Sequence, residues 1–163
     1  AQAIKKAHEI GWKPVHYLNN VSISVGAVLK PAGLDASKDI ISAAYIKDAT
    51  DPQFQKDADM IAWNAFMDKY HPQGDKTSSF TVYGYAVAST MLEVLKRAGD
   101  NLTRENVMKQ AASLKGVEIP MLLPGIKINT SATDFYPIQS VRLERFDGKT
   151  WHLFGDVLSN ESE

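Results

Sequence analysis

Histidines and aspartates are the residues of this sequence whose side chains most often bind metals or transfer protons. None of the four histidines has a second ligand-type residue at the helical spacing of a zinc or di-metal site. Four of the aspartates crowd into residues 48–59, a segment with few apolar neighbours that would raise a carboxyl pKa. We interpret the histidines as structural or surface residues and the aspartates as a solvent-facing loop. These residues are His8, His16, His71, His152, Asp48, Asp51, Asp57 and Asp59.

Nucleophilic catalysis is not indicated either. The sequence has no cysteine, and its nearest approach to a nucleophile elbow, Ser22-Ile-Ser24-Val-Gly26, lacks the first glycine of that turn. Glycine-rich phosphate loops and dinucleotide fingerprints are also missing. We therefore expect a protein that is not an enzyme and that uses no metal and no cofactor.

Two groups of side chains suit a binding site. Asn20 and Ser22 follow a short apolar run at residues 15–18, and open α/β sheets place ligands beyond the ends of such strands. Phe80 and Tyr83 lie near the start of a predicted helix. Each group also has a purely structural interpretation, because the polar residues suit a turn and a helix cap and the aromatic residues suit a core.

The elements that would position these residues change along the chain. Residues 1–47 alternate helix, strand, helix and strand, with strands expected at residues 15–18 and 40–46, and this alternation favours parallel pairing covered by helices. Residues 47–59 indicate a crossing or linker. Apolar stripes then predict one helix around residues 63–70 and another whose buried face is Val87, Ala88, Met91, Leu92 and Leu95.

The last third begins with a capped helix and ends with strands. Thr103 is the expected N-cap of a helix that closes at Gly116. Two alternating runs, residues 138–146 and 150–158, flank Asp147-Gly148, which predicts a β-hairpin.

Composition bounds the class of protein. The 163 residues carry a formal charge of −1 and are 44% hydrophobic, which is enough to bury a core. Because neither charge sign collects in a long run, nucleic acid and membrane surfaces are not expected as direct partners. No apolar run approaches the roughly 20 residues of a membrane helix.

Five segments in order carry a family resemblance. They are AQAIKKAHEIGWKP, SVGAVLKPAGLD, AFMDKYHPQGD, FTVYGYAVASTMLEVLKRAGDNLTRENVMKQAASLKG and MLLPGIKINTSATDFYPIQSVRLERFDGKTW. Together they resemble the C-terminal portion of a periplasmic solute-binding protein of the leucine/isoleucine/valine-binding type, which serves ABC importers. The resemblance runs through nearly all of the chain.

The resemblance implies an incomplete two-lobe α/β fold of the type I periplasmic binding proteins, with parallel sheets covered by helices and a closing β-hairpin. Members have two lobes joined by three crossings and enclose the ligand between the lobes. By this resemblance, residues 1–47 belong to the second lobe, residues 48–137 to the first, and residues 138–163 return to the second. The first helix has no capping residue before Ala1, which we interpret as a sign that upstream residues are missing.

The resemblance also implies ligand contacts. Asn20 and Ser22 fall where the family places polar contacts of the second lobe, although branched-chain binders have an acidic residue there. Phe80 falls where the family places a large apolar side chain against the ligand, with Tyr83 as a neighbour and Tyr45 as wall or hinge. The missing acidic residue favours a carboxylate-bearing ligand without an obligatory amino group, such as an aromatic acid, over an amino acid.

The function implied is capture of a small amino acid or of an aromatic or other carboxylate ligand in the periplasm, after removal of a signal peptide not present in this chain, and its delivery to a membrane ABC permease. Two alternatives stay open: the chain is a ligand-sensing module of a receptor or regulator, or a fragment with no binding activity by itself. A fragment that lacks most of two sheets is expected to self-associate through exposed apolar surface.

Overall fold

The structure is a computed structural model that describes residues 1–160. Helices and a small sheet are mixed, which confirms the predicted α/β class. The α-helices are α1 (Gln2–Glu9), α2 (Lys30–Ala32), α3 (Ala58–Tyr70), α4 (Ser79–Ala98) and α5 (Arg104–Ala111), and the strands are β1 (Ile41–Ala44), β2 (Ser140–Phe146) and β3 (Trp151–Ser159). Short helices of other types are η1 (Asn20–Ser22), η2 (Val25–Leu29) and η3 (Pro52–Phe54).

The sheet has the order β1-β2-β3, and both strand pairs are antiparallel. Its register places Ile41 opposite Arg145 and Phe146 opposite Trp151. The expected hairpin is therefore present, and it pairs through β2 with a strand about 100 residues earlier in the chain. Of its predicted range 138–163, residues 161–163 lie outside the described residues.

The hairpin turn is built around Asp147. Its Oδ1 accepts hydrogen bonds from the backbone N–H groups of Lys149 and Thr150, both at 2.7 Å. Gly148 has a φ of 99°, in the left-handed region that glycine enters without steric cost. The Asp-Gly signal thus acts through local backbone chemistry, which is why it is readable in the sequence.

The parallel strand expected at residues 15–18 is reduced to one bridge. Tyr17 pairs with Ile41 in parallel, and Leu18 donates its N–H to the carbonyl of Ile41 at 2.8 Å. The side chains of Val15 and Tyr17 are 76% and 71% exposed, so this run is not buried as its apolar character suggested. Parallel pairing within residues 1–160 is limited to this bridge, and the sheet proper is antiparallel.

The long helix α4 ends at Gly99 as predicted, but it buries a different face. The expected stripe is largely open to solvent, with Met91 51% and Leu92 53% exposed. The buried residues of α4 are instead Val82, Ala86, Val94 and Ala98. Because α4 is apolar on more than one side, its sequence pattern does not determine which side meets the core.

The helices α3 and α5 agree more closely with the apolar stripe and the N-cap predicted for them. Trp63 and Met67 of α3 are buried, whereas the ring of Phe66 is 41% exposed and lies 5.1 Å from that of Tyr85 on α4. Thr103 caps α5, because its side chain accepts a hydrogen bond from the N–H of Asn106.

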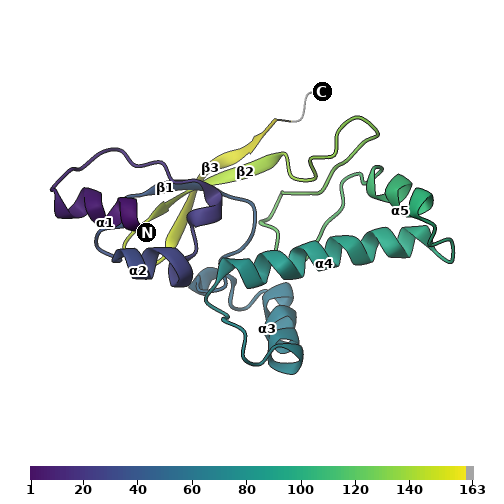
Figure 1. The fold of residues 1–163 in the computed structure, drawn as a ribbon, viewed down its shortest axis with the longest axis horizontal. Helices are drawn as coiled ribbons and strands as arrows, with labels where there is room; N and C mark the ends of the chain where they lie inside the picture. Colours follow the sequence, from purple (N-terminus) through teal and green to yellow (C-terminus); the bar gives the residue numbers. More distant parts are fainter. Residues whose placement is uncertain (161–163) are drawn as a thin grey trace.

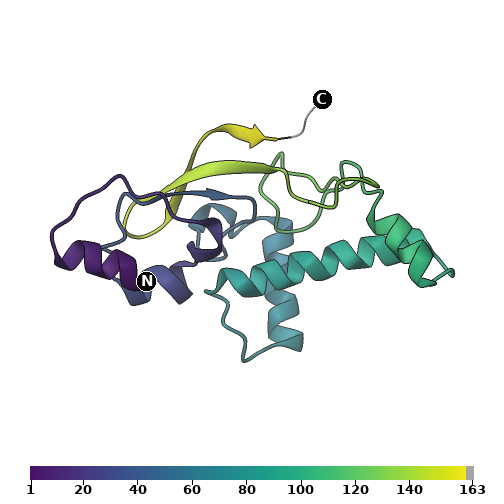
Figure 2. The same ribbon diagram turned by 45° about the horizontal axis from the view of Figure 1, so that its top comes forward.

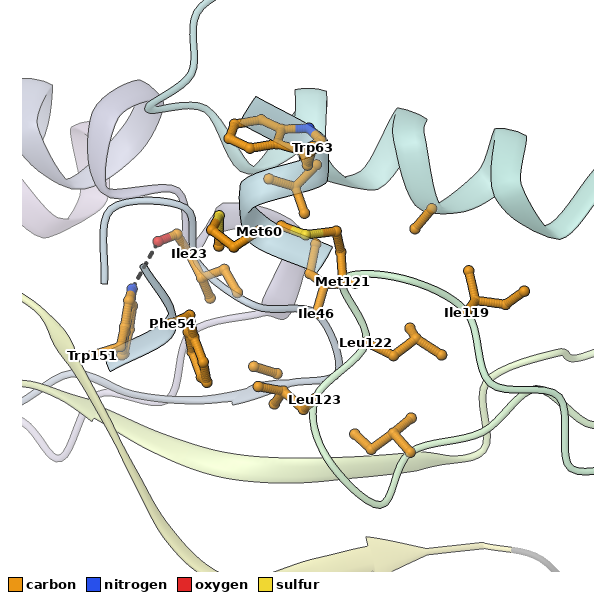
Figure 3. Close-up of a cluster of buried hydrophobic side chains, with 14 of the residues drawn as sticks. Ile23, Ile46, Phe54, Met60, Trp63, Ile119, Met121, Leu122, Leu123 and Trp151 are labelled. Carbon is orange, nitrogen blue, oxygen red and sulfur yellow. Dashed lines mark hydrogen bonds between the residues drawn. The ribbon is translucent and has the colours of Figure 1, made fainter. Parts of the chain in front are cut away.

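The core lies where α3, the segment around residue 121 and the hairpin come together. Figure 3 shows a cluster in which Trp63 and Met60 of α3 approach Met121, while Trp151 of β3 donates its indole N–H to the carbonyl of Ile23 at 2.9 Å. Trp63, Met60 and Met121 are at most 1% exposed. Side chains from α3, β3 and the segment around Met121 thus exclude water together.

Two groups of elements are visible in the ribbon. The helices α1 and α2 lie beside the sheet at one end of the molecule, and α3, α4 and α5 lie toward the other end (Figure 1). After rotation by 45°, the strands still run on one side and the start of α4 still lies next to α2 (Figure 2). The segments that connect the two groups follow β1 and precede β2.

Candidate functional site

A hollow of about 230 Å³ lies where the polar segment after residue 18, the end of β1 and the start of α4 come together. Four of the five residues predicted to bind ligand line it, namely Asn20, Tyr45, Phe80 and Tyr83. Ser22 belongs to the same short helix as Asn20 but does not line the hollow. The structure therefore brings together residues that are up to 63 positions apart in the sequence.

The polar wall is a short helix with its own cap. The side chain of Asn19 accepts a hydrogen bond from the N–H of Val21 at 3.0 Å and so starts η1 at Asn20. Asn20 is half-buried at the hollow, with an amide that both donates and accepts hydrogen bonds. The cap proposed for this cluster from sequence is thus formed by Asn19, and the side chain of Asn20 takes no part in it.

Tyr45 is fixed by the backbone on both of its sides. It follows β1 directly, and its carbonyl accepts the N–H of Leu123 at 2.9 Å. Burial, and to a smaller extent the neighbouring Tyr83, raise the pKa of the Tyr45 phenol. Tyr45 therefore stays neutral at physiological pH and offers a hydroxyl as donor and acceptor.

The aromatic wall comes from the first turn of α4. Ser78 caps that helix by accepting the N–H of Phe80, which sets the direction in which Phe80 and Tyr83 leave the backbone. Their side chains are 56% and 49% exposed, so the core interpretation of these aromatic residues is not what the structure shows.

Five further residues line the hollow that the sequence did not single out. They are Val21, Ile23, Ala44, Ile46 and Ser79. Each of them directly adjoins a predicted residue in the sequence, so this proximity was the signal that could have identified them. Every described residue of the lining is uncharged, and such a surface suits a small ligand held by apolar contact and a few directional hydrogen bonds.

A second, larger hollow of about 620 Å³ shares Asn20, Tyr45, Ile46 and Tyr83 with the first. It continues along α4 between that helix and residues 111–141 and is mostly apolar, lined there by Ala86, Val94, Leu114, Ile128 and Ile138. The candidate site thus opens on one side into an apolar groove.

Metal and membrane features are simple to describe. Within residues 1–160, no histidine, aspartate or glutamate cluster is arranged to hold a metal ion. Among the same residues, no helix combines the length and the apolar character needed to cross a bilayer.

Comparison with known proteins decides the family. The model of the periplasmic binding protein family matches residues 1–150. The chain belongs to the periplasmic binding protein family. The family resemblance found in the sequence is therefore confirmed for nearly its whole length, and no curated protein sequence gives a further match.

Solved structures share the fold of this binding-protein chain. A branched-chain amino acid ABC transporter protein from Thermus thermophilus with bound valine has a TM-score of 0.79 at 16% identity, over 97% of this chain and 42% of that one. A substrate-binding periplasmic protein from Ralstonia solanacearum gives 0.74 at 19% identity, over 94% and 42%. A leucine-binding protein from Thermotoga maritima gives 0.62 at 16% identity, over 97% and 41%. The chain spans about two fifths of the length of these proteins.

Proposed function

We propose that this chain is part of the solute-binding component of an ABC importer, located in the periplasm, that captures a small ligand and presents it to a membrane permease. The observation that carries the proposal is the uncharged hollow into which Asn20, Tyr45, Phe80 and Tyr83 converge in a chain of the periplasmic binding protein family. Amide and phenol groups would orient the ligand, and the aromatic rings would supply apolar area. Binding and release need no covalent step.

The arrangement of the elements supports a division into lobes. Residues 1–47 and 138–160 meet through the pairing of β1 with β2, whereas α4 packs on α5 within residues 48–137. We assign the first two ranges to the second lobe and residues 48–137 to the first. The hollow then lies between the lobes, and a ligand that contacts both would favour the closed population.

The charge of the lining suggests a class of ligand. An amino acid ligand carries an ammonium group, which is bound best by a carboxylate. The described lining offers Asn20, Ser79 and two tyrosines but no carboxylate. We therefore favour an acid with an apolar or aromatic body, such as benzoate, over valine or leucine.

Replacing Phe80 by alanine in the full-length product of the gene is expected to weaken ligand binding by about 1 to 3 kcal/mol, the range for a buried large apolar group. Isothermal titration calorimetry with benzoate, L-valine and L-leucine measures it. Leu92→Ala is the matched control, because Leu92 lies on the same helix but lines a different groove, between α3 and α4. Unchanged affinity in Phe80→Ala would remove Phe80 from the site, and binding of valine or leucine alone would exclude the aromatic-acid class.

The exposed apolar side of α4 supports self-association of this chain when it is produced alone. Val87, Met91, Leu92 and Leu95 are 40% to 53% exposed along one side of the helix. We expect the isolated chain to form dimers or larger species by light scattering, and Met91→Lys to shift it toward monomers. Thr133→Lys, at an exposed loop position, controls for the added charge. A monomeric, cooperatively melting wild-type chain would contradict the proposal.

A further inference from the structure

The hydroxyl oxygen of Ser24 lies between the two walls of the candidate site. Ser24 is 1% exposed, and its Oγ accepts the N–H of Ala27 at 3.2 Å, which caps η2. The same oxygen accepts the N–H of Ser79, the first residue of α4, also at 3.2 Å. One buried atom therefore joins the segment that carries Asn20 to the helix that carries Phe80.

Gly26 allows η2 to approach the segment before α4 closely at a second point. A Cβ atom at this position would lie 2.2 Å from Oγ1 and 2.9 Å from the carbonyl oxygen of Thr77. Thr77 precedes α4 by two residues, so the backbone of η2 packs closely against the segment that leads into α4. Only a residue without a side chain fits there, because the carbonyl oxygen of Thr77 belongs to the backbone and moves only with its segment.

The segment that follows η1 is also bound to the hairpin. The indole of Trp151 on β3 donates to the carbonyl of Ile23, the residue before Ser24, at 2.9 Å, and both side chains are buried (Figure 3). The segment at Ile23 and Ser24 thus has one bond to the hairpin and one to α4. With the hairpin side fixed, the bond from Ser79 sets the position of α4 relative to the site.

We propose that Ser24 is a positioning residue for the candidate site, with Gly26 as its partner: together they hold the start of α4, and with it Phe80 and Tyr83, against the polar wall. This inference rests on the proposed ligand-binding function. Neither residue lines the hollow, so their effect on binding is indirect. Loss of the bond leaves each wall folded but lets the two walls move apart.

The start of α4 allows a matched pair of variants. Ser79→Ala keeps the N–H that Ser24 accepts, whereas Ser79→Pro removes it and places a ring carbon where the hydrogen pointed. Proline is compatible with the first position of a helix, and Ser78 before it has an extended backbone with φ −91° and ψ 126°. Both variants lose the same hydroxyl from the lining, so their difference isolates the N–H. Ser24→Ala removes the acceptor instead.

Spin labels can measure the position of α4 without any ligand. The chain has no cysteine, so Lys5→Cys on α1 and Lys96→Cys near the end of α4 give specific attachment points, and both lysines are exposed. We expect the same distance distribution in the labelled parent and in Ser79→Ala, and a distribution shifted toward longer distances in Ser79→Pro and Ser24→Ala. Helix content by circular dichroism should be the same in all four.

Calorimetry on the full-length protein links this to binding. Titration with benzoate and L-valine is expected to show a roughly 2- to 10-fold loss of affinity in Ser24→Ala and Ser79→Pro relative to Ser79→Ala, the range for one hydrogen bond. Parent-like label distances in both variants, or distances that change without a change in affinity for a probe that the parent binds, would overturn the inference. If neither probe binds the parent protein, the proposed ligand class fails, and the label distances still decide whether Ser24 holds α4.

Discussion

Replacing Glu144 by glutamine is expected to abolish a loss of about 3 to 5 kcal/mol in stability that the wild-type protein shows between about pH 4.5 and 8. Glu144 is 3% exposed on β2, and no hydrogen-bond donor reaches its Oε1 within the described residues. Burial first, and then the charges of Asp48 and Asp51, raise its pKa from an ordinary 4.5 to about 8. The neutral carboxyl is therefore the form that the fold accommodates.

The sign of the pH effect follows from the raised pKa. Between pH 4.5 and about 8 the folded protein keeps the Glu144 proton and the unfolded chain releases it, so the unfolded state binds fewer protons and the free energy of unfolding falls as pH rises. Each pH unit in that window costs about 1.4 kcal/mol. Glutamine has the shape of the neutral form and does not ionise, so this contribution disappears.

Urea unfolding at pH 5 and pH 8 measures the difference between the two proteins. Gln73→Glu offers a control in the opposite direction, since Gln73 is exposed and a carboxylate at this position stays solvated. An identical pH profile in wild type and Glu144→Gln would show that Glu144 ionises normally in the fold.

Glu144 also marks what the sequence could not reveal. The aspartates at residues 48–59 suggested a solvent-facing loop, yet Asp51 is 4% exposed, and burial raises the pKa of Asp48. Their neighbours include Glu144, more than 90 positions later. A local pattern of polar residues carries no information about a strand that returns from so far along the chain.

Features that depend on nearby residues were predictable. The turn at Asp147-Gly148, the cap at Thr103 and the end of α4 at Gly99 follow from backbone hydrogen bonds within four residues or from positive φ angles. The buried face of α4 was not, because helices with two apolar sides leave the choice to tertiary packing. Of the candidate site, the sequence yielded four of the nine residues that line the hollow but not Ser24, whose bond to Ser79 spans 55 positions.

Lys47 joins the two groups of elements at the crossing that follows β1. Its side chain is 9% exposed, and its Nζ donates to Oδ2 of Asp57 and Oδ1 of Asp59, each at 2.8 Å. Oδ2 of Asp59 also accepts the N–H of Met121 at 2.9 Å, and the Lys47 N–H donates to the carbonyl of Met121 at 2.8 Å. The start of α3, the end of the β1 segment and residue 121 thus form one network.

The network sets the charges of its members. Burial alone would lower the pKa of Lys47 and raise that of Asp59, but the hydrogen bonds between them overcome burial, so the pKa of Lys47 is raised and that of Asp59 is lowered. Because its pKa is lowered, Asp59 stabilises the folded protein at pH values above its ordinary pKa of 3.8. This stabilisation is lost as the pH falls through the pKa of Asp59 in the folded protein.

Replacing Lys47 by methionine is therefore expected to destabilise the protein by about 3 kcal/mol at pH 7, because two carboxylates lose the cation that neutralises them while the chain length of the side chain is kept. Chemical denaturation measures the loss. Asp57 is 38% and Asp59 23% exposed, so water screens part of the remaining charge. The loss of stability therefore lies near the lower end of the range for breaking a buried ion pair.

Lys76→Met is the matched control: its ion pair with Asp68 lies on the surface, with side chains 35% and 71% exposed, and should contribute less than about 1 kcal/mol. Equal effects of the two substitutions would show that the Lys47 ion pairs contribute no more than a surface ion pair. A triple variant, Lys47→Met with Asp57→Asn and Asp59→Asn, tests the cause of the loss. If it regains most of the stability, the cost lies in the unpaired carboxylates.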